Sequence, residues 1–237
     1  MDPEIEECIE WLNCQLADIQ TFLGGIEERI KGDTKRFPGG GNLSVPILVY
    51  SHLEYISALF CGKSAENANV KKCKECKRII SDYNATQNVK LFVEKFFPNN
   101  YKQYPLLFWD GIRNAVTHRF SPKALTVNEA GESYTLRFQF YVEDNKIPAY
   151  AEMVNSDLIF IKVNAFELYT IVKKATSDYF SILESDTQLQ QNCLEVWKAI
   201  KAHSRDITRD TQGKCKEAKL IISQLAAGKG KTPLLTT

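Results

Sequence analysis

The sequence predicts a mainly α-helical protein with a small antiparallel β-sheet inserted between its helices. Apolar residues recur at steps of three and four over residues 3–31, which is the spacing of one buried helical face. Between residues 130 and 163 the repeat shortens to two residues, as it does in strands with one buried face. Hydrophobic residues make up 44% of the 237 residues and charged residues 25%, which is typical of a folded globular protein rather than a disordered one.

Two long helices are predicted in the N-terminal part of the chain. The first covers residues 3–31, and a Pro/Gly-rich loop at residues 37–42 ends it. Its apolar stripe consists of Ile5, Ile9, Leu12, Leu16, Ile19, Leu23, Ile26 and Ile30. The second helix is predicted from Ser44 up to Gly62 and is apolar on nearly all sides. Because a helix of that composition is usually buried, we expect it at the centre of the domain.

The middle of the chain changes from helix to strand. The lysine-rich residues 62–84 lack a broad apolar face, and we expect a peripheral excursion there that could be helical. Helices are predicted at residues 89–97 and 104–120, each ended by a nearby proline, because the residue before a proline avoids the helical conformation. Alternation of apolar and polar residues predicts strands at residues 134–142, 147–153 and 158–163.

The C-terminal part is predicted to be helical again. Asn164 and Glu167 have the spacing of a capping box at the start of a helix that runs to residue 183, and Thr187 with Gln190 begins another helix. The sequence thus predicts one domain, residues 1–226, with a helical bundle formed by residues 1–122 and 164–226, a β insertion at residues 130–163, and a disordered tail at residues 227–237.

Composition indicates a protein of the cytoplasm. No segment approaches the roughly 18 apolar residues of a membrane span, and the acidic N-terminus lacks the features of a signal peptide. The seven cysteines are an odd number, which favours reduced thiols over a disulfide framework. The formal net charge of +1 gives no global field for a polyanion, so affinity for nucleic acid requires a local basic patch.

The predicted helix 104–120 carries a coherent polar face opposite its apolar one. The polar side chains on that face are Asp110, Arg113, Asn114, Thr117 and His118. An arginine holds a phosphate through two parallel hydrogen bonds, and a histidine gives or takes a proton near neutral pH. RNA can be cleaved by its own 2′-hydroxyl, so a site for this reaction needs positive charge and a proton shuttle. Arg113 and His118 supply both, although a solvated helix face is the simpler interpretation of their spacing.

The segment RNAVTH, residues 113–118, resembles the R-x4-6-H motif of the HEPN superfamily (higher eukaryotes and prokaryotes nucleotide-binding). As in that family, the motif follows a long first helix and a buried second one. The resemblance implies an antiparallel helical bundle and a metal-independent endoribonuclease that uses no cofactor. It further implies a homodimer with a composite active site and a toxin, defence or stress role, with an antitoxin protein as a partner in some systems.

The resemblance also assigns roles to residues of this chain. Arg113 would hold the phosphate, His118 would act in proton transfer, and Asn114 would assist. The family often adds an acidic residue from the second helix, for which Glu54 is the candidate; a structural ion pair with Arg113 is the alternative role of Glu54. Further expected RNA contacts are Asp110, Thr117, Arg119, Lys123 and Lys102. A non-catalytic module of the same fold, which binds a nucleotide, RNA or a protein, is the alternative function.

Other groups carry weaker signals. Cys73 and Cys76 have metal-ligand spacing, but a structural zinc needs four ligands and no second pair follows. His52 lies on the buried second helix and is expected to be a core histidine, and His203 is expected to be exposed. A basic run could contact RNA phosphates or simply form a solvated face: Lys71, Lys72, Lys74, Lys77 and Arg78.

Overall fold

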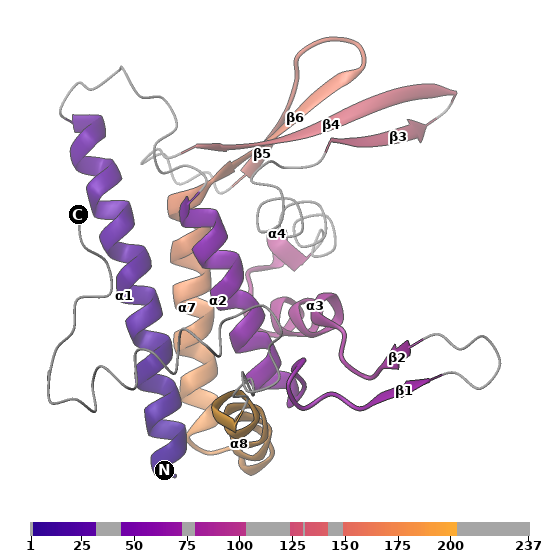
Figure 1. The fold of residues 1–237 in the computed structure, drawn as a ribbon. Coiled ribbons are helices and arrows are strands. Elements are labelled where there is room, and N and C mark those ends of the chain that lie inside the picture. Colours follow the sequence, from indigo (N-terminus) through magenta and orange to yellow (C-terminus); the bar gives the residue numbers. More distant parts are fainter. Residues whose placement is uncertain are drawn as a thin grey trace, which may run out of the picture. The chain divides into compact units, whose positions relative to one another are not determined.

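The computed structural model describes residues 2–31, 44–72, 79–102, 124–129, 131–141 and 149–202 (Figure 1). Residues 1–200 form one compact unit. The predicted helix 104–120, the predicted domain boundary at residue 226 and the predicted tail lie outside the described residues.

The chain is mostly helical, and three long helices pack against one another: α1 (Pro3–Lys31), α2 (Ser44–Cys61) and α7 (Ala165–Leu183). α1 runs opposite to α2 and α7 (Figure 1). The bounds of α1 and α2 agree with the sequence prediction. The predicted stripe of α1 is confirmed over its first six residues, since Ile9 is partly buried and the other five are buried: Ile5, Leu12, Leu16, Ile19 and Leu23. The side chains of Ile26 and Ile30 lie outside the described ones.

α2 forms the centre of the core, as its composition predicted. Its buried residues include Val49, Leu53, Ile56 and Leu59. Among the described helices α2 alone is long and apolar enough, by length and composition, to cross a membrane. The expectation that no segment reaches this length was therefore wrong. Since 56% of its apolar window is buried inside the protein, α2 fits the core helix of a soluble protein.

Two shorter helices, α3 (Ala85–Phe96) and α4 (Asn99–Lys102), follow in the sequence, and α3 packs against α2. α3 begins four residues before the predicted start at residue 89. The reason is a helix cap, because the side chain of Asn84 accepts a hydrogen bond from the backbone N–H of Gln87 at 3.1 Å.

The excursion between α2 and α3 is a β-hairpin, so the expectation that it could be helical was wrong. β1 (Val70–Lys72) pairs antiparallel with β2 (Ile79–Ser81). Three-residue strands carry too little alternation to be recognised in a lysine-rich segment, and their pairing depends on residues that close the base of the hairpin.

The inserted sheet contains β3 (Leu125–Glu129), β4 (Glu132–Tyr141), β5 (Ala149–Met153) and β6 (Leu158–Asn164), in the order β3-β4-β6-β5. β4 and β6 are parallel, whereas the two outer pairs are antiparallel. The predicted antiparallel sheet is therefore a mixed one. β5 was expected to pair with β4 but pairs with β6, β3 was not predicted, and the insertion begins at Leu125 rather than at residue 130.

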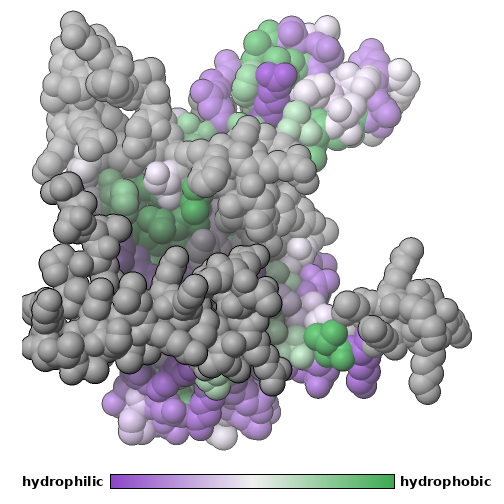
Figure 2. All heavy atoms as spheres, viewed as in Figure 1, coloured by the Kyte–Doolittle hydropathy of each residue, from purple (hydrophilic) through white to green (hydrophobic). Residues whose placement is uncertain are grey.

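One face of the sheet is apolar and only partly covered. Phe138 and Phe140 of β4 and Ile161 and Val163 of β6 belong to the buried core. Farther along the same strands or their neighbours, apolar side chains are exposed: Val127, Met153 and Val154. Figure 2 shows apolar residues among the strands at the top and a mostly hydrophilic surface over α8 (Thr187–Ala202) at the bottom.

The start of α7 is fixed by the cap predicted from the sequence. The buried side chain of Asn164 accepts a hydrogen bond from the backbone N–H of Phe166 at 3.1 Å. α8 is capped differently from the prediction. The Asp186 side chain, not that of Thr187, accepts from the backbone N–H groups of Gln188 and Leu189.

We expect Asn164→Ala to lower the free energy of unfolding by about 1 kcal/mol, because it removes the acceptor for an orphan N–H of the first helical turn. Asn164→Asp keeps an acceptor and should lose less. Asn13→Ala is a matched control on the exposed face of α1 and should leave stability nearly unchanged. Urea denaturation of the three variants gives the comparison. A loss in Asn13→Ala as large as that in Asn164→Ala would contradict the capping role.

Candidate functional site

Most of the site residues predicted from the sequence lie outside the described residues. These are Asp110, Arg113, Asn114, Thr117, His118, Arg119 and Lys123. The two that the structure describes are Glu54 on α2 and Lys102 at the end of α4. The candidate site is therefore built from Glu54 and the side chains that surround it.

Glu54 is half-buried and lines a pocket of about 220 Å³. α2, the segment that follows it, the residue before the cap of α3, and α8 all contribute to the wall. The described lining residues are Ser51, Glu54, Tyr55, Ala58, Ser64, Ala65, Glu66, Tyr83 and Ile200. A space of this size accommodates one side chain or a small polar group together with water.

A tyrosine hydroxyl is one partner of Glu54. Tyr83 donates a hydrogen bond from its hydroxyl to Glu54 Oε1 at 3.0 Å. Tyr50 and Ala58 share the stripe of Glu54 on α2 and are buried, so a carboxylate at this position needs a partner. Arg113 was proposed from the sequence for this role and lies outside the described residues.

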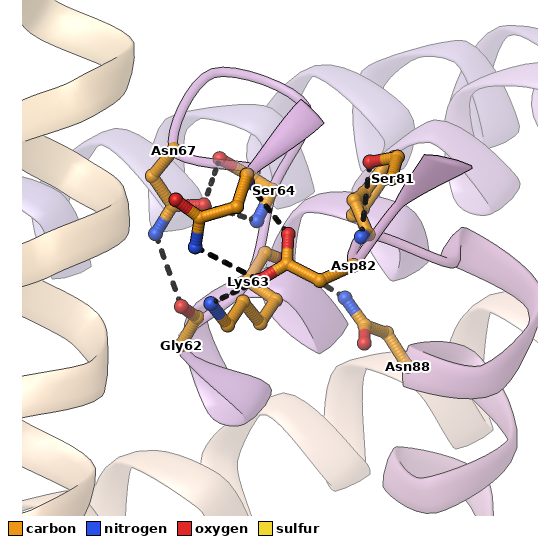
Figure 3. A network of polar contacts seen from close by, with 9 residues as sticks. Gly62, Lys63, Ser64, Asn67, Ser81, Asp82 and Asn88 are labelled. Atoms are coloured by element: carbon orange, nitrogen blue, oxygen red, sulfur yellow. Dashed lines mark hydrogen bonds and ion pairs between the residues drawn. The ribbon is translucent and has the colours of Figure 1, made fainter. Parts of the chain in front are cut away.

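A network of polar contacts between the end of α2 and the start of α3 positions Tyr83 (Figure 3). Gly62 ends α2 with φ at +70°, a left-handed conformation that favours glycine. The following residue, Lys63, forms an ion pair of 2.8 Å with Asp82. Asp82 also accepts from the backbone N–H of Asn69 at 2.6 Å. Tyr83 follows Asp82 directly, and its backbone N–H donates to Ser81 Oγ at 3.1 Å, so the network holds the backbone from which the Tyr83 side chain extends.

The same network stabilises the charged form of the Asp82 side chain. Lys63 and then Asn69 donate hydrogen bonds to the carboxylate of Asp82 and lower its pKa to about 2. Asn67 and Asn88 satisfy backbone carbonyls in the turn, since their side-chain amides donate to Gly62 O at 3.0 Å and to Lys63 O at 2.7 Å. The loop after α2 is therefore held by side chains from both sides of the hairpin.

The electrostatic character of the described pocket is acidic. Burial raises the pKa of Tyr55, and the nearby carboxylates of Glu66 and Glu54 raise it further. Carboxylates beside phenol hydroxyls can accept a proton or hold a cationic group, but they repel phosphate. Phosphate chemistry at this pocket therefore requires basic side chains in addition to the described lining residues.

Lys102 is half-buried at the end of α4 and is not among the residues that line this pocket. Sequence reasoning, in turn, did not single out Tyr83, Tyr55 or Glu66. The one local feature of the sequence that could have drawn attention to Tyr83 is that it precedes Asn84, the cap of α3. No feature of the sequence linked Tyr83 to Glu54, which lies 29 residues earlier.

His52 is a core histidine, as the sequence predicted. Its Nδ1 lies 3.0 Å from Gln15 Oε1 on α1, and its Nε2 lies 3.0 Å from Thr176 Oγ1 on α7. The ring is 1% exposed, and burial lowers its pKa to about 4. His52 thus joins the three long helices and lies outside the pocket of Glu54.

Among the remaining sequence candidates, only Lys71 has a described side chain, which is exposed on β1. The pair Cys73 and Cys76, the basic side chains from Lys72 to Arg78, and His203 lie outside the residues whose side chains the structure describes. Within the described ranges, no group of three or more His, Cys, Asp or Glu side chains is arranged to hold a metal ion.

Comparison of the chain with models of protein families, with curated proteins and with solved structures gave no match.

Proposed function

We propose that this protein is a metal-independent endoribonuclease of HEPN type, acting as a homodimer in which two copies of Arg113 and His118 form one active site. The observation that carries the proposal is the segment RNAVTH in its place in the chain, after a long first helix and a buried second helix. The packing of α1 against α2 and α7, which run opposite to it, supports the proposal, because the resemblance implies a helical bundle.

The proposed reaction needs only groups that the motif supplies. Arg113 holds the phosphodiester and offsets the charge that builds up on its oxygens. The RNA 2′-hydroxyl attacks the adjacent phosphorus, and His118 transfers protons in the course of this attack and the departure of the 5′-oxygen. The products are a 2′,3′-cyclic phosphate and a 5′-hydroxyl. Asn114 orients the imidazole or contacts the ribose.

Residues around the motif complete the proposed substrate surface. Asp110, Thr117, Arg119, Lys123 and Lys102 are assigned to RNA contacts on the basis of their sequence position. Glu54 is assigned as the acidic helper from the second helix. Its half-buried position at a pocket and its hydrogen bond from Tyr83 support that role, because a carboxylate held by a phenol hydroxyl is oriented yet still able to pair with an arginine.

The biological setting we propose is a toxin or a defence or stress effector in the cytoplasm, with an antitoxin protein as partner. Such an enzyme has to be restrained in the cell that makes it, and a protein partner that covers the active site is a direct way to do so. The apolar core position of α2 supports a soluble protein.

The test is cleavage of a mixed RNA pool by the purified protein in excess EDTA. We expect wild type to cleave and His118→Ala and Arg113→Ala to fall to background. His203→Ala and Arg137→Ala are matched controls outside the motif, and Arg137 is exposed on β4. They should cleave as wild type does.

Two results would overturn the proposal. A folded, dimeric wild type that binds RNA or nucleotide without cleaving it would identify a non-catalytic binding module. Cleavage that persists in both motif variants would place the activity elsewhere.

A further inference from the structure

Two cysteines from opposite ends of the chain meet in the core. Cys8 on α1 and Cys193 on α8 have their sulfur atoms 3.9 Å apart, although 185 residues separate them. Both thiols are free, and the two residues are 0% and 1% exposed. A disulfide needs the sulfurs at about 2 Å, so the two sulfur atoms have to approach each other by about 2 Å to be joined.

We propose that Cys8 and Cys193 form a reversible disulfide when the protein meets a hydroperoxide, and that this bond fixes α8 to α1. The proposal concerns residues outside the ribonuclease motif and does not depend on the proposed activity.

The environment of the pair indicates which sulfur reacts first. The thiol of Cys8, and to a lesser degree the hydroxyl of Tyr179, lower the pKa of Cys193 because they stabilise its thiolate. The contact with Cys193, together with burial, raises the pKa of Cys8. Burial acts against these contacts and raises the pKa of Cys193, but the net direction is downward. We therefore assign Cys193 as the sulfur that is oxidised first and Cys8 as the thiol that resolves the intermediate; the reverse order would give the same disulfide.

The oxidation is balanced by one molecule of hydrogen peroxide. The Cys193 thiolate attacks one peroxide oxygen, the O–O bond breaks, and the departing oxygen leaves as water after taking up a proton. Cys193 is then a sulfenic acid. The Cys8 sulfur attacks the Cys193 sulfur and expels the hydroxyl as a second water. Two thiols are oxidised by two electrons, and the peroxide is reduced to two waters.

Burial selects the oxidant and the cysteines that react. Because the pair has almost no exposed surface, the oxidant that we propose is hydrogen peroxide, which is hardly larger than water, rather than a bulky disulfide. Cys61 is a poorer nucleophile, because burial raises its pKa to about 11. Cys14 on α1 is exposed and provides an internal reference for non-selective oxidation.

Other contacts hold α8 close enough to α1 for the bond to form. The rings of Trp197 and Trp11 lie 5.5 Å apart, and Lys198 forms an ion pair of 3.0 Å with Glu4. These contacts can open and close again. A covalent bond would keep α8 in place until it is reduced, and with it Ile200, which lines the pocket of Glu54.

The experiment uses the full-length protein, first reduced and then freed of reductant. It is treated with hydrogen peroxide, its remaining thiols are blocked, and it is digested without reduction for mass spectrometry. We expect the main oxidation product to be the Cys8 peptide joined to the Cys193 peptide. We expect Tm to rise on the order of 10 °C, because a cross-link over so long a loop restricts the unfolded chain. Dithiothreitol should reverse both changes.

Two cysteine variants and the peptide map of the wild-type protein together test whether the Cys8–Cys193 disulfide forms. Cys193→Ser should lose the rise in Tm, whereas Cys14→Ser should keep it. The proposal is overturned if peroxide oxidises Cys14 while Cys8 and Cys193 are both recovered as blocked thiols from folded protein. It is also overturned if the linked peptides come from two different molecules. Because the map is made on wild type, it gives an answer even if Cys193→Ser fails to fold.

Discussion

Phe92→Ala should lower the free energy of unfolding by about 3–5 kcal/mol, among the largest effects of any single substitution in this core. Phe92 is 0% exposed on α3. Its ring lies 5.8 Å from that of Phe60 on α2 and 6.1 Å from that of Tyr179 on α7. Truncation therefore removes apolar contacts with two other helices at once and leaves a cavity between them.

Leu91→Ala is the matched control for this prediction, since Leu91 is the preceding residue of the same helix and is 41% exposed. Its loss should stay below about 1 kcal/mol, because most of its apolar surface already contacts water. Urea denaturation monitored by far-UV circular dichroism gives both values. Equal losses for the two variants would mean that helix propensity, not core packing, determines the stability of α3.

The helices could be predicted because their signals are local and repeated. In α1, apolar residues recur over eight turns, and any single misleading residue is outweighed by the rest. In α7 the cap residue Asn164 fixed the start to within one residue. The start of α8 was assigned one residue late, because Thr187 and Asp186 are both good cap residues and only the structure distinguishes them.

The sheet could be predicted only in part, because alternation identifies a strand but not its neighbour. Each pair of adjacent strands in the chain looked like a hairpin, yet β4 pairs with β6 in parallel, and β5 lies at the outer edge. β3 was missed because LTVNE is short and mostly polar. Its pairing with β4 depends on Gly131, whose φ of +87° allows the tight turn between them.

The candidate site, like the sheet, could be predicted only in part. The motif RNAVTH and the acidic residue Glu54 were proposed from the sequence through a family resemblance; the motif lies outside the described residues, whereas Glu54 lies at a pocket. The contact from Tyr83 to Glu54 depends on the hairpin base, where Lys63, Asn69 and Asp82 come together. Contacts that depend on several loop residues at once leave no periodic signal, so the lining of the pocket could not be predicted.

Acid should destabilise the protein through His52, and the effect should begin at a higher pH than that of the carboxylates. In the folded protein the pKa of His52 is lowered to about 4 by burial, against about 6.5 in an unfolded chain. Between about pH 6.5 and pH 4, His52 therefore carries a proton in the unfolded state but not in the folded state. The contribution of neutral His52 to the free energy of unfolding is fully present above about pH 6.5 and is lost as the pH falls toward about 4.

The size of the effect follows from this difference in pKa. Between pH 7 and pH 5 the free energy of unfolding should fall by about 2 kcal/mol on account of His52 alone. Asp82 acts in a lower range, because its pKa of about 2 means that its contribution is lost only below about pH 4. Denaturant titrations at several pH values from 7 to 5 would therefore report mainly on histidine.

His52→Gln separates this contribution from all others, because every other titratable group is present in both proteins. Glutamine can keep one hydrogen bond toward Gln15 or Thr176 but cannot gain a proton. The variant should be less stable than wild type at pH 7, since it leaves part of the polar space between α1, α2 and α7 unfilled. Its stability should then change little down to pH 5, and the two curves should converge. Parallel curves would mean that the core opens enough to hydrate the His52 ring, and the three-helix junction would then be looser than its hydrogen bonds imply.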